Sequence, residues 1–89
     1  MSLRKLELCI PQSKREKIIE ALQTEGGLGQ ADHVGESIVV VNAENCTKIE
    51  VVCCTSARAG ALLNLLTGKY GLGVDFGTIT SVLVASSRP

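Results

Sequence analysis

The sequence predicts an α+β domain in which two helices lie on one face of a four-stranded antiparallel sheet. The first observation is an internal repeat, because Gly27-Leu28-Gly29 returns 44 positions later as Gly71-Leu72-Gly73. The second is that each glycine segment follows an apolar stripe at helical spacing and precedes a β-branched run. Further coincidences at this offset are Cys9 with Cys53, Ile18 with Leu62, Leu22 with Leu66, Ser37 with Ser81, and residues 38–40 with 82–84. The repeating unit is therefore a strand, a helix, a Gly-Leu-Gly corner and a second strand.

The first unit begins with residues 5–10, whose apolar and polar side chains alternate as in a half-buried strand. Ser13 and Glu16 have the spacing of a capping box, in which a hydroxyl and a carboxylate satisfy free amides at the start of a helix. Gly26 and Gly27 can supply the left-handed residue that ends this helix. The β-branched run 37–41 then predicts the second strand.

The second unit is joined to the first by residues 42–45, which have the composition of a turn. Thr55 or Ser56 can cap the second helix, and Gly68 or Gly71 can end it. The predicted strands are 5–10, 37–41, 47–54 and 78–85. The order β-α-β-β-α-β contains two split crossovers related by a pseudo-twofold axis, which is the ferredoxin-like sandwich.

Length and composition predict one domain, residues 1–85, with residues 86–89 as the start of a linker or tail. Nine basic and nine acidic residues give no net charge, and only Tyr70 and Phe76 are aromatic, so nucleic-acid binding is not expected. No apolar run approaches the roughly 20 residues that span a bilayer, and the amino terminus does not resemble a secretory signal. We therefore expect a soluble, cytoplasmic domain.

The four cysteines lack the paired C-x-x-C spacing of a zinc site. Free cysteine is among the most buried residue types, so we expect buried, reduced thiols, with a metal site or a disulfide as alternatives. The only histidine, His33, stands beside Asp32 in an irregular segment, residues 28–35. A general base or a metal ligand needs convergent partners, so we expect a solvated loop histidine, no metal, no cofactor and no catalytic residues.

The glycines of Gly71-x-Gly73-x-x-x-Gly77 resemble part of a nucleotide-binding fingerprint. That fingerprint requires glycines that follow a strand and open a helix, so that phosphate meets helical amides. Here the glycines follow a helix and open a strand. We therefore expect a helix-to-strand corner with positive φ angles rather than a phosphate site.

The sequence offers a candidate anion site at the start of the first helix, at Ser13, Lys14 and Arg15. Cations in a first helical turn oppose the helix dipole, and such a charge can indicate an anion held by free amides and basic side chains. The alternative is that both basic residues face water. Thr55, Ser56 and Arg58 repeat the arrangement at the second helix, at the opposite end of the sheet.

The sheet face away from the helices should be mixed in character, and the second strand is apolar without charged residues to block pairing. Exposed edges of that kind invite pairing with another chain, so we expect a homo-oligomer that forms through the sheet. The residues expected on the uncovered face are Lys5, Glu7, Cys9, Lys48, Glu50 and Val52.

The segments Leu6-Glu7-Leu8-x-Ile10-Pro11 and Gly71-Leu72-Gly73-Val74-x-Phe76-Gly77-Thr78-Ile79 resemble the soluble amino-terminal domain of the membrane proteins called domain of unknown function 389. In that family such a domain precedes a hydrophobic multi-helix region. The resemblance implies a regulatory or assembly domain whose partner is a membrane-embedded part of the same chain, at the cytoplasmic face of a membrane. It carries no catalytic residues to transfer.

The opening strand and helix are also similar to nitrogen-regulatory PII proteins and their trimeric relatives. Those proteins bind nucleotides between subunits with a long loop between strands two and three, where this chain has only residues 42–45. The resemblance implies an alternative function, a PII-like or ACT-like sensor of a small anionic metabolite. The first hypothesis remains a non-catalytic regulatory domain that oligomerises through its sheet.

Overall fold

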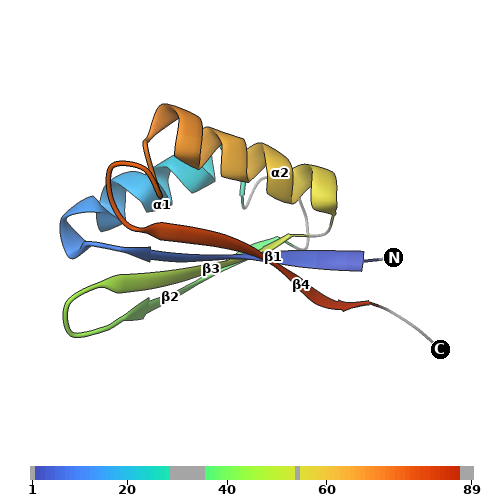
Figure 1. The fold of residues 1–89 in the computed structure, drawn as a ribbon, viewed down its shortest axis with the longest axis horizontal. Helices are drawn as coiled ribbons and strands as arrows, with labels where there is room; N and C mark the ends of the chain where they lie inside the picture. Colours follow the sequence, from blue (N-terminus) through green and yellow to red (C-terminus); the bar gives the residue numbers. More distant parts are fainter. Residues whose placement is uncertain (1, 29–35, 54, 87–89) are drawn as a thin grey trace.

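A computed structural model describes residues 2–28, 36–53 and 55–86 of the chain. It contains the predicted elements in the predicted order (Figure 1). Their bounds are β1 (Ser2–Ile10), α1 (Arg15–Thr24), β2 (Ser37–Asn42), β3 (Thr47–Cys53), α2 (Ser56–Asn64) and β4 (Thr78–Ser86). A 3-10 turn, Gln12–Lys14, precedes α1, and a π-helical turn, Leu65–Lys69, extends α2. None of the described helices has the length and apolar character needed to cross a membrane.

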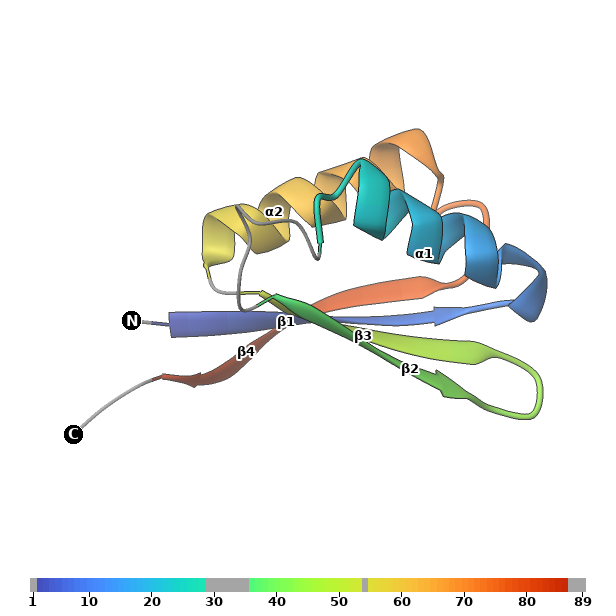
Figure 2. The ribbon, with the colours of Figure 1, turned by 180° about the vertical axis from the view of Figure 1, so that it is seen from behind.

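The four strands form one antiparallel sheet in the order β2-β3-β1-β4. Both helices lie on the same face of this sheet, and the opposite face carries no helix (Figures 1 and 2). The predicted ferredoxin-like fold is therefore confirmed. The order leaves β2 and β4 as edge strands, and it gathers the end of β1, the β2–β3 turn and the start of β4 at one end of the sheet.

The core lies between the sheet and the two helices. Alternate residues of the central strands, such as Leu6 and Leu8 of β1 and Ile49 of β3, contribute fully or almost fully buried side chains. Ile18 and Leu22 of α1 pack with them and are completely buried. This is the burial expected from period-two strands beneath period-3.6 helices.

The repeat at an offset of 44 holds through the helices and into the corners. Leu28 N–H donates to the Leu22 carbonyl at 3.1 Å, and Leu72 N–H donates to the Leu66 carbonyl at 3.0 Å. Gly27 has φ 74° and Gly71 has φ 76°, which confirms the expected left-handed corner. Gly29 lies outside the described residues.

In the strands the same offset fails by one residue. Leu8 is in the core, whereas Val52, 44 positions later, pairs with Lys5 and lies on the uncovered face. Ile38 packs against the core, whereas Val82 also pairs with Lys5. Strand side chains alternate between the two faces of the sheet. A shift of the alignment by one residue therefore matches core positions of one unit with uncovered-face positions of the other. The alignment of the strands in the sequence repeat was therefore wrong, because the two units differ in the length of their connections.

The predicted capping box at Ser13 is also wrong. Ser13 lies inside the 3-10 turn, and the N-cap residue of α1 is Lys14, which makes no side-chain cap. The turn closes instead through the Lys14 N–H and the Pro11 carbonyl at 2.9 Å. The second helix follows the prediction, because Thr55 Oγ1 accepts a hydrogen bond from the Arg58 N–H at 3.1 Å.

Candidate functional site

The start of α1 borders an open hollow of about 670 Å³. Ser13 and Arg15, two of the three residues of the predicted anion site, line it together with Gln12, Glu16 and Asn42. The side chain of Gln12 donates to the Ala43 carbonyl at 3.2 Å, which ties the 3-10 turn to the β2–β3 turn. The hollow is therefore built where two turns meet at one end of the sheet.

Arg15, which lines this hollow, has an unsatisfied donor. Its Nε atom is buried and has no hydrogen-bond partner among the described residues. Buried polar groups are nearly always hydrogen-bonded, so such an atom calls for an explanation. A guanidinium group that borders an open hollow can donate to an anion there.

Lys14, the third predicted residue, is directed elsewhere. Its Nζ atom lies 5.0 Å from the centre of the Phe76 ring, in a cation–π contact with the corner before β4. It does not line the hollow that Ser13 and Arg15 share. The structure thus brings two of the three predicted residues together and separates the third.

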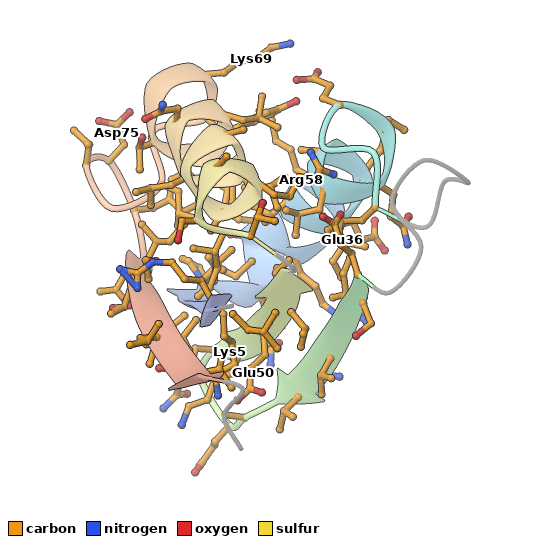
Figure 3. The ribbon with its side chains drawn as sticks, turned by 90° about the vertical axis from the view of Figure 1, so that its right-hand side faces the viewer. Lys5, Glu36, Glu50, Arg58, Lys69 and Asp75 are labelled. Atoms are coloured by element: carbon orange, nitrogen blue, oxygen red, sulfur yellow. The ribbon has the colours of Figure 1, made fainter. Side chains whose placement is uncertain are left out.

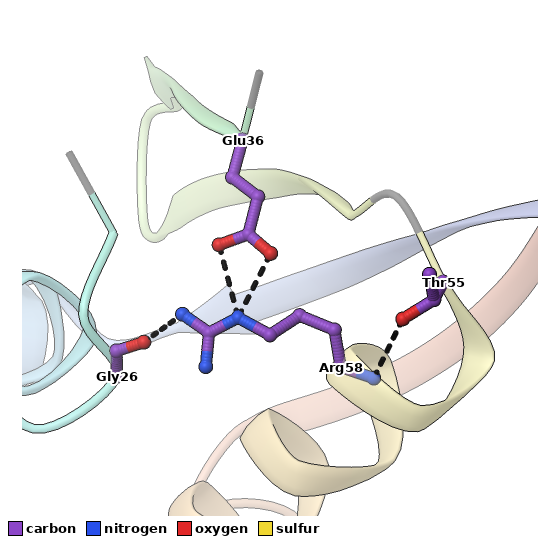
Figure 4. Close-up of polar contacts among 4 residues, drawn as sticks. All are labelled: Gly26, Glu36, Thr55 and Arg58. Carbon is purple, nitrogen blue, oxygen red and sulfur yellow. Dashed lines mark hydrogen bonds and ion pairs between the residues drawn. The ribbon is translucent and has the colours of Figure 1, made fainter. Parts of the chain in front are cut away.

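Arg58, the basic residue near the start of α2, is hydrogen-bonded to other residues of the chain (Figure 4). Arg58 Nε donates to Glu36 Oε2 at 2.8 Å and to Glu36 Oε1 at 3.0 Å. A terminal nitrogen of the same guanidinium donates to the Gly26 carbonyl. The Glu36 side chain is only 3% exposed. Arg58 therefore joins α2 to the end of α1 and the start of β2, and it leaves little for a ligand.

The uncovered sheet face carries a charge cluster at its centre. Lys5 Nζ lies 3.2 Å from Glu7 Oε2 and 3.8 Å from Glu50 Oε1. Lys5 and Glu50 project from the side of the sheet opposite the helices (Figure 3). Towards the β2 edge this face becomes apolar, with Val39 and Val41 about half exposed. The predicted mixed character of this face is therefore present.

An exposed polar cluster joins the far ends of the two helical segments. Glu25 Oε1 accepts from Lys69 Nζ at 2.7 Å and from the Tyr70 hydroxyl at 2.8 Å. The hydrogen bond from Lys69, and then that from Tyr70, lower the pKa of Glu25. The carboxylate in turn raises the pKa of Lys69 and of Tyr70. This cluster has the chemistry of a structural link between helices.

The cysteines differ from the prediction. Cys9 and Cys46 are half-buried rather than fully buried, and their Sγ atoms lie 3.2 Å apart. The sequence contained no direct signal for this contact, because the two residues are 37 positions apart and meet only through the β1–β3 register. Cys54 and the side chain of Cys53 lie outside the description, as do Asp32 and His33.

Within residues 2–28, 36–53 and 55–86, no three histidine, cysteine, aspartate or glutamate side chains gather as they do in a metal site.

The comparisons with known proteins concern the fold. No protein-family model matches the chain, and no curated protein matches it. Among solved structures, it is similar to CPII, a nitrogen regulatory PII-like protein from Thiomonas intermedia K12 bound to ADP, AMP and bicarbonate. The TM-score is 0.61 at 17% identity, and the match covers 100% of this chain and 97% of that one.

Two further neighbours have the same architecture. A putative PII-like signalling protein from Thermus thermophilus has a TM-score of 0.58 at 14% identity, over 94% of this chain and 89% of that one. A putative antibiotic biosynthesis monooxygenase from Chloroflexus aurantiacus has a TM-score of 0.55 at 17% identity, over 99% and 98%. Their differing names illustrate that fold and function are separate. The likeness shows that this chain has the ferredoxin-like fold.

Proposed function

We propose that this chain is a non-catalytic regulatory domain that assembles with copies of itself through its sheet. The observation that carries the proposal is the sheet face without helices, which continues into the exposed edge strand β2. Val39 and Val41 on this edge are 48% and 54% exposed. An apolar edge strand with unpaired backbone groups favours pairing with another strand. The PII-like neighbours add support for a regulatory role.

A second copy suits the charges of this face. Lys5 and Lys48 stand beside Glu7 and Glu50, so the face is electrically balanced. Two identical faces related by a twofold axis can place lysine opposite glutamate, as a self-complementary interface requires. The valines of β2 would supply the apolar part of the contact.

Sedimentation velocity at micromolar concentrations tests assembly. We expect wild-type protein to sediment as an oligomer and Val41→Lys to shift it toward the monomer, because a charge on an edge strand opposes pairing. Val74→Lys is the matched control, since Val74 is 79% exposed but lies in the corner before β4, away from the sheet. A wild-type chain that is wholly monomeric would rule out the assembly.

A second candidate function is the binding of a small anionic metabolite in the hollow beside Arg15. The specific observation in its favour is the buried Arg15 Nε atom, which has no hydrogen-bond partner among the residues the structure describes. CPII, similar in fold, was solved with ADP, AMP and bicarbonate. In this chain the β2–β3 connection is only a short turn, so we propose an anion the size of bicarbonate or phosphate rather than a nucleotide.

Thermal shift measurements at constant ionic strength separate the two functions. Bicarbonate or phosphate that binds the folded state should raise the Tm by linkage, whereas AMP and ADP should not raise it further. Arg15→Ala should abolish the rise, as should Lys14→Ala combined with Arg15→Ala. Lys17→Ala is the control for a lost charge on the same helix. No rise with any of the four anions would exclude the sensor.

The resemblance to the domain of unknown function 389 adds a proposal about the protein to which this domain belongs. The domain would serve a membrane-embedded region of the same chain, at the cytoplasmic face of the membrane. The reading frame that encodes the chain tests this directly. Apolar segments of roughly 20 residues beyond Pro89 are expected, and their absence would remove the proposed partner.

A further inference from the structure

We propose that Cys9 at the end of β1 and Cys46 in the β2–β3 turn form a redox modification site, a dithiol that closes into an intramolecular disulfide. Their Sγ atoms share a hydrogen bond of 3.2 Å. The oxidant that we propose is a low-molecular-weight disulfide of the glutathione type. Both cysteines belong to one copy of the chain, so the bond needs no second copy.

The sheet places the two sulfur atoms together. Cys9 pairs with Lys48 across β1 and β3, and Cys46 precedes Lys48 by two residues. Residues two apart along a strand direction share a face, so Cys46 is the diagonal neighbour of Cys9. A disulfide has an S–S length of about 2.05 Å, so the sulfur atoms must approach by roughly 1 Å. Cys46 lies in a turn, where a shift of this size disturbs no strand pairing.

A small oxidant can reach the pair. Both cysteines are half-buried rather than enclosed. Cys9 also lines an open hollow of about 290 Å³ on the uncovered sheet face, beside Lys48 and Thr78. The hydrogen bond with Cys9, and then burial, raise the pKa of the Cys46 thiol. Attack on a disulfide requires a thiolate, so the pair reacts through the fraction of thiol that has lost its proton.

The reaction proceeds in two exchange steps. One cysteine loses its proton to solvent and attacks the glutathione disulfide, which forms a mixed disulfide and releases one glutathione thiolate. The second cysteine loses its proton and attacks the protein sulfur of the mixed disulfide, which forms the Cys9–Cys46 bond and releases the second thiolate. The two protein thiols lose two electrons and two protons, and the oxidant becomes two molecules of glutathione.

Tryptic peptide mapping tests the proposal, because trypsin separates the relevant cysteines. Cys9 falls in residues 6–14, Cys46 in residues 18–48, and the remaining two in residues 49–58. The 89-residue chain is incubated with oxidised glutathione, blocked with N-ethylmaleimide and digested without reductant. We expect a linked species that joins 6–14 to 18–48 and is 2 Da lighter than the sum of its reduced peptides. Full alkylation of both peptides, glutathione adducts alone, or links to 49–58 instead would overturn the proposal.

Three variants keep the result specific. Cys46→Ser changes a turn residue and should abolish the linked species, and Cys9→Ser should do the same. The double variant Cys53→Ser with Cys54→Ser should still form it.

The bond closes a loop of nearly 40 residues, so oxidation should raise the Tm by roughly 10–20 °C in the wild type and not in Cys46→Ser. An unchanged Tm in a fully linked wild type would show that the bond strains the fold, and would overturn the claim that the native geometry accommodates it.

Discussion

The two strand-to-helix junctions contain the same kinds of residue, yet the arginines at the two junctions differ in their hydrogen bonding. At the start of α2, Thr55 caps the helix and Arg58 is engaged by Glu36 and the Gly26 carbonyl. At the start of α1, Ser13 makes no cap, and Arg15 has a buried Nε atom without a partner among the described residues. A basic residue near a helix start can therefore be a candidate for anion binding only when the fold leaves one of its donors without a partner. We call the start of α1 the open junction, because Arg15 Nε has no partner among the described residues, and the start of α2 the closed junction, because Arg58 is bonded to Glu36 and Gly26.

The largest expected effect comes from breaking the closed junction. Arg58→Ala leaves the Glu36 carboxylate, which is 3% exposed, without its cation. Removing one partner of a buried ion pair costs about 3–5 kcal/mol, whereas Arg15→Ala should cost less than about 1 kcal/mol. Urea denaturation measures both. Glu36→Leu combined with Arg58→Met should recover most of the loss, and equal effects of the two arginine variants would contradict the distinction.

The next largest effect is expected at Gly77, in the corner that leads into β4. Gly77 has φ 64°, and a Cβ atom there would stand 2.6 Å from the Cys9 carbonyl oxygen. Gly77→Ala should therefore lower the free energy of unfolding by roughly 2–4 kcal/mol. Gly60→Ala is the matched control, because a Cβ atom on this α2 residue meets nothing within 4 Å. That variant should stabilise the helix by about 0.5–1 kcal/mol, as thermal denaturation can show.

A smaller effect isolates the helix caps. Thr55→Ala removes the acceptor for the Arg58 N–H and should cost about 1 kcal/mol. Ser13→Ala removes no cap and should stay within about 0.5 kcal/mol of the wild type. Chemical denaturation of both variants under identical conditions makes the comparison. A cost at Ser13 as large as that at Thr55 would mean that α1 is capped after all.

The smallest effect depends on pH. The pKa of Glu25 is lowered in the folded chain, so its contribution is present above its ordinary pKa of 4.5 and is lost as the pH falls through the lowered value. The pKa values of Lys69 and Tyr70 are raised, so their contribution is lost as the pH rises through the raised values. Glu25→Gln should therefore lower the Tm slightly near neutral pH, and this difference should vanish as the pH falls through the lowered pKa of Glu25. A Tm difference that is constant from pH 3 to pH 7 would contradict this.

The elements could be predicted from the sequence because each has a local cause. Alternation marks β1, the spacing of Leu62 and Leu66 marks α2, and the Gly27 and Gly71 corners need positive φ. Each of these signals is contained within a few neighbouring residues, and tertiary contacts only reinforce it.

The details that failed depend on how distant segments meet. The capping box at Ser13 was locally plausible, but the 3-10 turn after Pro11 placed that hydroxyl one step too early. The contact between Cys9 and Cys46 follows from the β1–β3 register, which periodicity does not determine. Whether Arg58 is engaged depends on where Glu36 lies, and no sequence pattern pairs the two residues.

The one-residue slip of the repeat limits how the molecule could be made symmetric. An engineer who copied residues 1–44 onto the second half at the sequence offset would set Lys5 at the position of Ile49 and Glu7 at that of Val51. Both native side chains are fully buried, so the duplicate would carry two charges into the interior. A symmetric design made from two copies of one half must therefore have one residue inserted or deleted between each helix and the strands that flank it.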